Sequence, residues 1–251
     1  MDLSELFWSA SLVELKNGYV EQGDRYLCLL CGRQIEKGII YPEEGVLYEA
    51  EKYMRSHIER AHQSVFDYLI DLDKKLTGLT EHQKSLLRLF YQGRSDRQVQ
   101  AELGIGSAST IRNHRFVLRE RERQARLFLA TMELLKEKDR YAPGFVNPHQ
   151  TARMMDDRYN VTEDEREEIL RKYFSEGTDG PLKSFPPKEK QRLVLLREIA
   201  GRFERGRSYR EQEVNQILQA VYHDHVTLRR FLVEYGFLDR KPDGGQYWLK
   251  I

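Results

Sequence analysis

Both cysteines of this 251-residue chain lie in one short run, Cys28-Leu-Leu-Cys31, and the histidines His57 and His62 follow further along. A Cys-x-x-Cys turn directs two thiolates at one ion, and two imidazoles near a helix end can supply the other corners of a tetrahedron. Gly32 permits the chain reversal that such a turn needs. We therefore expect one structural zinc site, with the ligands Cys28, Cys31, His57 and His62.

The residues between the two ligand pairs predict a strand and a helix. Residues 38–41 have the composition of a short strand, and residues 47–61 contain no glycine or proline, which favours a helix carrying both histidines. On an ideal helix the two imidazoles would point about 140° apart, so the last turn must loosen for both to reach one ion. The alternative is two buried cysteines and two surface histidines without a metal. A redox role for the cysteines is not favoured, because no thioredoxin-like strand and helix pattern surrounds them.

The order of the four ligands resembles that of a two-Cys two-His zinc finger. The resemblance implies a small zinc-binding ββα-like module. The interval between the ligand pairs is about twice the roughly 12 residues of the DNA-reading finger. We therefore expect a structural metal site here, without base reading by this module.

The charge of the chain is balanced overall but segregated locally. It has 41 basic and 40 acidic side chains, so any affinity for nucleic acid must come from a local concentration of charge. One such concentration lies between residues 112 and 126 and consists of Arg112, Arg115, Arg119, Arg121, Arg123 and Arg126, against Glu120 and Glu122. There is no apolar run of about 20 residues and no secretory signal pattern. We expect a cytoplasmic protein without a membrane segment.

Composition and turn residues divide the chain into four segments. We expect a zinc-finger-like module at residues 1–75, a helix-turn-helix with a long final helix at 76–140, a linker at 141–160, and a winged-helix-like domain at 161–251. The expected fold class is therefore mainly α.

The second segment has the capping pattern of three consecutive helices. Thr80, Ser95 and Ser107 are each placed to cap a helix, and Gly104-Ile105-Gly106 predicts the turn before the last one. This order of helix, turn and helix presents a DNA-reading helix to the major groove. Residues 79–118 resemble the helix-turn-helix of LuxR-type and sigma-region-four-type bacterial regulators, in the runs Gly93–Val99 and Thr110–His114.

The last of these helices supplies the candidate base contacts. Ile111 and Leu118 are seven residues apart and should point inward. The groove side then carries Ser109, Arg112, Asn113 and Arg115. The alternative is that these residues form an ordinary solvated helix face.

No helix breaker occurs from Ser107 to Lys138, which predicts one helix of about 45 Å. Leu118, Ala125 and Met132 recur every seven residues, as do Phe128 and Leu135. This stripe favours a homodimer seam, although packing against another part of the chain is the open alternative.

The last segment predicts helices followed by a hairpin. Thr162 with Glu165 forms a capping-box pattern, and residues 236–249 indicate a two-stranded wing. Over about residues 161–251 the chain resembles the bacterial family catalogued as domain of unknown function 2087. The runs that carry this resemblance are Phe185–Arg197, Tyr209–Asn215, Thr227–Gly236 and Tyr247–Trp248. Members of that family occur in transcriptional regulators, which implies regulation here.

The winged-helix-like domain adds basic residues suited to phosphate contact, of which we select Arg229, Arg230, Arg240 and Lys241. A winged helix used for protein contact, with Arg229 and Arg230 paired to local acids, is the alternative. Taken together, the sequence predicts a dimeric, zinc-containing transcriptional regulator that binds double-stranded DNA. The competing hypothesis is a protein-interaction module, such as an antirepressor or cofactor. An enzyme is not expected, because four protein ligands leave zinc no open position.

Overall fold

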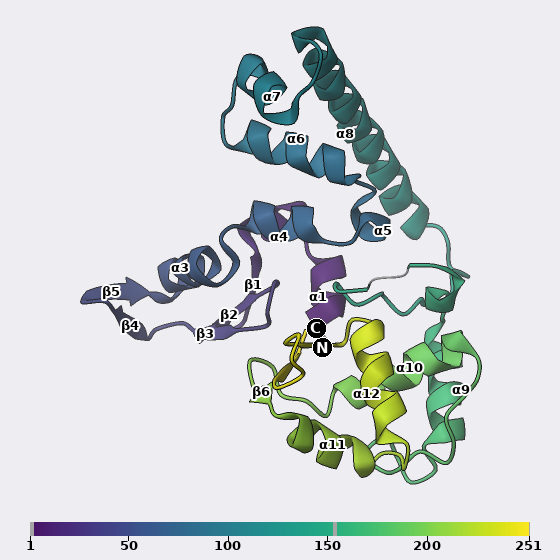
Figure 1. Cartoon of the computed structure of the whole chain (residues 1–251). Coiled ribbons are helices and arrows are strands. Elements are labelled where there is room, and N and C mark those ends of the chain that lie inside the picture. The colour runs from purple at the N-terminus through teal and green to yellow at the C-terminus, as the bar shows by residue number, and fades with distance from the viewer. Residues whose placement is uncertain (1–2, 153–154, 251) are drawn as a thin grey trace. The chain divides into compact units, whose positions relative to one another are not determined.

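The computed structural model describes residues 3–152 and 155–250 and is mainly helical, with small antiparallel sheets (Figure 1). The chain forms two compact units: residues 1–78 together with 144–251, and residues 79–143. Within the described ranges, none of the helices combines the length and the apolarity needed to cross a bilayer.

The N-terminal part of the first unit combines short helices with two small sheets. Strands β1, β2 and β3 form one antiparallel sheet in that order, β4 and β5 form a hairpin, and α3 packs against both. The elements are α1 (Leu3–Ser9), α2 (Leu12–Asn17), β1 (Tyr19–Gln22), β2 (Arg25–Cys28), β3 (Gln34–Glu36), β4 (Ile40–Glu43), β5 (Val46–Glu49), α3 (Ala50–His62), α4 (Val65–Asp71) and α5 (Lys74–Thr77). Their core includes Phe7, Leu29, Ile35, Met54 and Ile58.

One sequence-based expectation is wrong in this region. Residues 47–49, expected at the start of a helix, belong to strand β5, and the helix begins only at Ala50. The physical reason is the turn at Glu44 and Gly45, both of which have positive φ and so close a two-residue hairpin. Val46, Leu47 and Tyr48 then pair with β4 in register. The expected strand at 38–41 is displaced to residues 40–43.

The second unit consists of α6 (Glu81–Tyr91), α7 (Asp96–Leu103) and α8 (Ala108–Lys136). Thr80, Ser95 and Ser107 cap these helices as expected, each accepting a hydrogen bond from the third residue of its helix. A small core of Leu86, Val99 and Ile111 joins the three helices. The continuous helix expected after Ser107 is confirmed at 29 residues.

The C-terminal part of the first unit packs helices around a larger core and ends in a three-stranded antiparallel sheet of order β6-β8-β7. Thr162 and Glu165 form the expected capping box on its first α-helix. The elements are the 3-10 helix η1 (Asp157–Tyr159), α9 (Glu163–Tyr173), α10 (Glu189–Ala200), β6 (Ser208–Tyr209), α11 (Glu211–Gln219), α12 (His225–Glu234), β7 (Leu238–Arg240) and β8 (Tyr247–Leu249).

Residues 149–151, inside the expected linker, connect the two parts of the first unit. The His149 ring contacts the Tyr235 carbonyl oxygen at 2.9 Å through Nε2 and stacks on Phe237. The Thr151 hydroxyl donates to the Gly236 carbonyl at 2.7 Å. Gln150, which lies between these two residues in the chain, is buried and forms hydrogen bonds with Tyr68 and Leu29 of the N-terminal part. Adjacent side chains of one segment therefore hold the C-terminal helices and the cysteine region together.

Candidate metal centre

The two cysteines lie at the turn between β2 and β3. Cys28 is the last residue of β2, its backbone N–H donates to Arg33, and the Gly32 N–H donates back to the Cys28 carbonyl, both at 2.8 Å. Gly32 has a φ of 77°, the left-handed conformation that the reversal requires. Cys28 is buried, and Cys31 is half-buried. The local hydrogen bonds thus aim both sulfurs to the same side.

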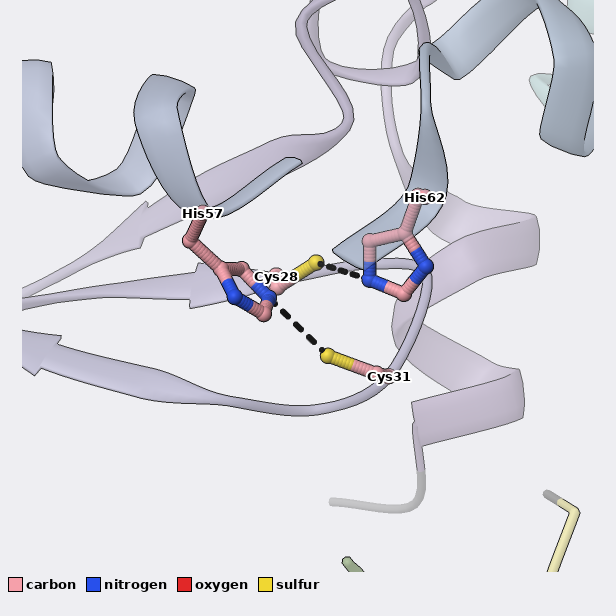
Figure 2. Close-up of side chains that lie close together, drawn as sticks. All are labelled: Cys28, Cys31, His57 and His62. Carbon is pink, nitrogen blue, oxygen red and sulfur yellow. Dashed lines mark hydrogen bonds between the residues drawn. The ribbon is translucent and has the colours of Figure 1, made fainter. Parts of the chain in front are cut away.

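The two histidines approach these sulfurs from α3 (Figure 2). His57 Nε2 lies 3.2 Å from Cys31 Sγ, and His62 Nε2 lies 3.8 Å from Cys28 Sγ. The helix extends as far as His62, and the chain leaves helical geometry at Gln63, whose φ is 61°. Both histidines therefore lie within α3, and the chain departs from helical geometry after the second one and not between them, as the spacing had led us to expect.

The four side chains lie close enough to bind one metal ion. Their ligand atoms are all within 4.8 Å of one another. Zinc–sulfur and zinc–nitrogen bonds of about 2.3 and 2.05 Å at the tetrahedral angle place sulfur about 3.6 Å from nitrogen. The two sulfur–nitrogen distances lie on either side of that value. Two thiolates and two imidazoles are also the donor set that zinc prefers, so the site is consistent with zinc.

The two thiols have pKa values shifted in opposite directions. The hydrogen bond between the two sulfurs raises the pKa of Cys28, and burial adds to this rise. The same bond lowers the pKa of Cys31, where His57 and His62 further stabilise the thiolate. The hydrogen bond between the sulfurs therefore favours a proton on Cys28 and a thiolate at Cys31. An ion bound by both sulfurs must displace the proton of Cys28, and binding releases it to solvent.

Arg33 occupies the outer side of His57. Its Nη1 lies 3.4 Å from His57 Nδ1, and its Nη2 donates to the Tyr53 hydroxyl at 3.2 Å. When Nε2 binds a metal, Nδ1 carries the ring proton, and a guanidinium can only donate. We therefore expect Arg33 to keep its bond to Tyr53 and to lose the contact with His57 when an ion is bound.

Two residues that the sequence did not single out support the cysteine turn. Gln150 Nε2 donates to the Leu29 carbonyl at 3.1 Å, and Gln150 Oε1 accepts from the Tyr68 hydroxyl at 2.8 Å. Burial raises the pKa of Tyr68, which also lies edge-on to His62. Neither residue belongs to a recognisable motif, and only the fold brings them together.

The candidate DNA contacts on α8 differ in their surroundings. Ser109, Arg112 and Asn113 are exposed, and Ile111 between them is fully buried. Among residues 3–152 and 155–250, Arg112 has no ion-pair partner. Arg115, by contrast, donates to Asp96 at 2.9 Å and lies 3.6 Å from the Phe90 ring centre, so it is engaged within its own unit.

The candidate phosphate contacts in the C-terminal part differ in exposure. Arg229 has only 16% of its side chain exposed and pairs with Glu211 at 2.6 Å, rather than with the nearby acids Asp224 or Glu234. Arg230, Arg240 and Lys241 are exposed. Arg230 lies over the Phe231 ring, and Arg240 and Lys241 follow one another at the end of β7.

Residues 181–249 match the family model described as "Uncharacterized protein conserved in bacteria (DUF2087)". The match confirms the resemblance for the part of the chain from just before α10 to the end of β8, and residues 161–180 lie outside it. Comparisons with curated proteins and with solved structures gave no match.

Proposed function

We propose that this protein is a DNA-binding transcriptional regulator in which α6, α7 and α8 form a helix-turn-helix and zinc is structural. The observation that carries the proposal is the phase of α8. Ile111 is buried in the core of the second unit, and so Arg112 and Asn113 are exposed on the first turns of the helix that follows Gly104 and Ser107. Arginine recognises guanine and asparagine recognises adenine through paired hydrogen bonds.

The proposal assigns different roles to the basic residues. Arg112, Asn113 and Ser109 are the candidates for base contact, whereas Arg115 contributes mainly to the packing of α8 on α6 through Phe90. In the C-terminal part, which we propose to be a winged helix, Arg230, Arg240 and Lys241 are candidates for phosphate contact. Arg229 holds α12 to α11 through Glu211, which leaves it less available to DNA.

The exposed apolar side chains of α8 support a homodimer. Leu127, Phe128 and Leu134 are 73%, 68% and 64% exposed, and residues 127–135 are apolar on almost every side of the helix. Such a helix needs a covering surface. A second copy of α8 would supply one, and a dimer would present two copies of the basic first half of the helix to DNA.

The test uses zinc-loaded protein and duplexes selected from bacterial genomic fragments. Arg112→Ala should weaken binding to a selected duplex by about 1–3 kcal/mol, because one bidentate base contact is lost. The control is Arg126→Ala on the same helix, which removes the same charge away from the first turns. Fluorescence anisotropy at several salt concentrations measures both variants. An equal loss in the two variants would remove Arg112 from the proposed base contacts.

The second candidate function is a module that binds another protein. The pairing of Arg229 with Glu211 favours it, because this arginine is partly withdrawn from any phosphate surface. The salt dependence of duplex affinity separates the two functions. Several phosphate contacts predict a steep fall of affinity with rising salt, whereas no selected duplex or a flat response supports the protein-binding module.

A further inference from the structure

The β4–β5 hairpin, which precedes α3, carries an exposed apolar face (Figure 1). Tyr41 and Tyr48 lie on its inner face, with their rings beside Tyr53 of α3. Because side chains alternate along a strand, Ile40 and Leu47 lie on the opposite face. These two residues are 53% and 71% exposed. Large apolar side chains gathered on one exposed face are typical of a surface that another molecule covers.

The backbone of the hairpin leaves one edge suited to pairing with a further strand. The turn has two residues, so the flanking pair Glu43 and Val46 exchanges both backbone hydrogen bonds. The next pair, Pro42 and Leu47, therefore directs its backbone groups outward. Pro42 has no N–H, which blocks the outer edge of β4. Leu47 offers its N–H and its carbonyl at the outer edge of β5, and within residues 3–152 and 155–250 no third strand pairs there.

The hairpin is acidic. Residues 38–51 contain four glutamates and no lysine or arginine. Two of the glutamates pair with arginines of α3, whereas Glu44 and Glu49 have no ion-pair partner in the described part of the chain. Glu49 lies on the same face as Leu47, and Glu44 lies in the turn. The open edge is therefore flanked by negative charge at both ends.

This charge disfavours a second copy of the hairpin as the partner. If two β5 strands paired antiparallel about Leu47, Glu49 of each would lie opposite Gly45 and beside Glu44 of the other. Like charges would then meet at both ends of the pair, which is unfavourable. A strand with lysine or arginine on either side of an apolar residue would place opposite charges at the same two positions.

We propose that the outer edge of β5 binds an extended, basic segment of another protein, which adds a third strand to the hairpin. Main-chain hydrogen bonds to Leu47 hold the added strand, and its apolar side chain packs beside the Leu47 side chain. The free glutamates select basic residues on either side of that apolar one. This site belongs to the zinc module and does not depend on DNA binding by α8.

The test measures the binding of a labelled peptide to the zinc-loaded full chain by fluorescence anisotropy. The peptide contains the run Lys-Thr-Val-Thr-Lys, so that its valine opposes Leu47 while its lysines approach Glu44 and Glu49. In one control peptide, glutamate replaces both lysines. In another, the valine carries an N-methyl group in place of its N–H. The N-methyl peptide keeps both lysines but cannot donate to the Leu47 carbonyl.

The test variant of the protein is Leu47→Lys, which removes the apolar contact and adds a charge of the same sign as that of the peptide. The matched control is Leu12→Lys on α2, because Leu12 is 68% exposed and so is comparable with Leu47. Circular dichroism checks that both zinc-loaded variants keep the helix content of the parent protein. Should Leu47→Lys fail to fold, the N-methyl peptide still decides the question with the parent protein.

We expect the parent protein and Leu12→Lys to bind the lysine peptide equally. Leu47→Lys should bind it about tenfold more weakly, because the burial of one leucine side chain is lost. The acidic and N-methyl peptides should bind the parent about fivefold more weakly or less. No binding of the lysine peptide, equal affinity for the N-methyl peptide, or equal weakening in the two lysine variants would overturn the proposal.

The two alternatives give separate results. A lower molecular mass of Leu47→Lys than of the parent in sedimentation equilibrium would assign the edge to a second copy and would also overturn the proposal. A negative result with the peptide leaves the DNA-binding regulator standing, because this assay contains no DNA.

Discussion

Individual side chains of this protein show how a metal centre depends on residues that do not bind the metal. The four ligands are recognisable from their order, but the turn that carries two of them is held by Gln150, more than a hundred residues away in sequence. The same amide accepts from Tyr68, beside His62. Its single side chain thus satisfies two buried polar groups around the site.

Replacing Gln150 should therefore be costly. Gln150→Ala leaves the Leu29 carbonyl and the Tyr68 hydroxyl without their partner in a buried place, so we expect the free energy of unfolding to fall by about 1–3 kcal/mol. Urea unfolding of the zinc-loaded protein measures the change. Gln219→Ala, at the exposed end of α11, is the matched control and should change stability by less than about 0.5 kcal/mol. Equal effects of the two variants would show that the Gln150 contacts contribute little.

Helix α8 is basic in its first part and apolar in its last part. Residues 112–126 carry six arginines, and residues 127–135 carry the exposed leucines and Phe128. Of its 29 residues only Ile111 is buried, and the hydrogen bond from Arg121 to Gln83 of α6 lies near the middle of the helix. The apolar turns after Arg126 depend on helix propensity or on a partner that covers their side chains.

This imbalance leads to a prediction about assembly. Phe128→Glu combined with Leu135→Glu places charges on the expected seam, so a dimer should dissociate into monomers while the helix content is retained. Sedimentation equilibrium measures the mass, and circular dichroism measures the helix. Arg119→Glu with Arg126→Glu is the control for added acidic charge on the same helix. A monomeric parent protein would exclude the seam altogether.

Taken as a whole, the chain divides its stability between two units with separate cores. The metal centre belongs to the unit that contains residues 1–78 and 144–251, whereas α6, α7 and α8 pack around their own small cluster of Leu86, Val99 and Ile111. Since a structural zinc site contributes of order 10 kcal/mol to the folding of its module at neutral pH, loss of the ion should affect the two units unequally.

Removal of zinc should expose the N-terminal module selectively. A strong chelator is expected to abolish the protection of backbone amides against hydrogen exchange in residues 19–62, while the amides of α6 and α7 keep theirs. Hydrogen-exchange mass spectrometry with and without the chelator measures both regions in one experiment. Cys31→Ser should reproduce the effect without a chelator. Unchanged protection in residues 19–62 would show that this module folds without metal.

Much of this architecture follows from short-range chemistry in the sequence. Thr80, Ser95, Ser107 and Thr162 cap helices because a side-chain oxygen needs only the next few backbone N–H groups. The metal ligands are predictable for a similar reason, since thiolates two residues apart can meet one ion from a single turn. The start of α3 was mispredicted because the hairpin turn at Glu44 and Gly45 outweighed the absence of helix breakers after it.

The tertiary structure decided what the local pattern does not contain. It paired Arg115 with Asp96 and Arg229 with Glu211, and among the described residues it left Arg112, on the same helix as Arg115, without an ion pair. It also brought Arg205, Trp248 and Lys250 to the cysteine turn. These arrangements depend on contacts between segments distant in sequence, and an isolated charge pattern gives no information on which partner the fold will place beside each side chain.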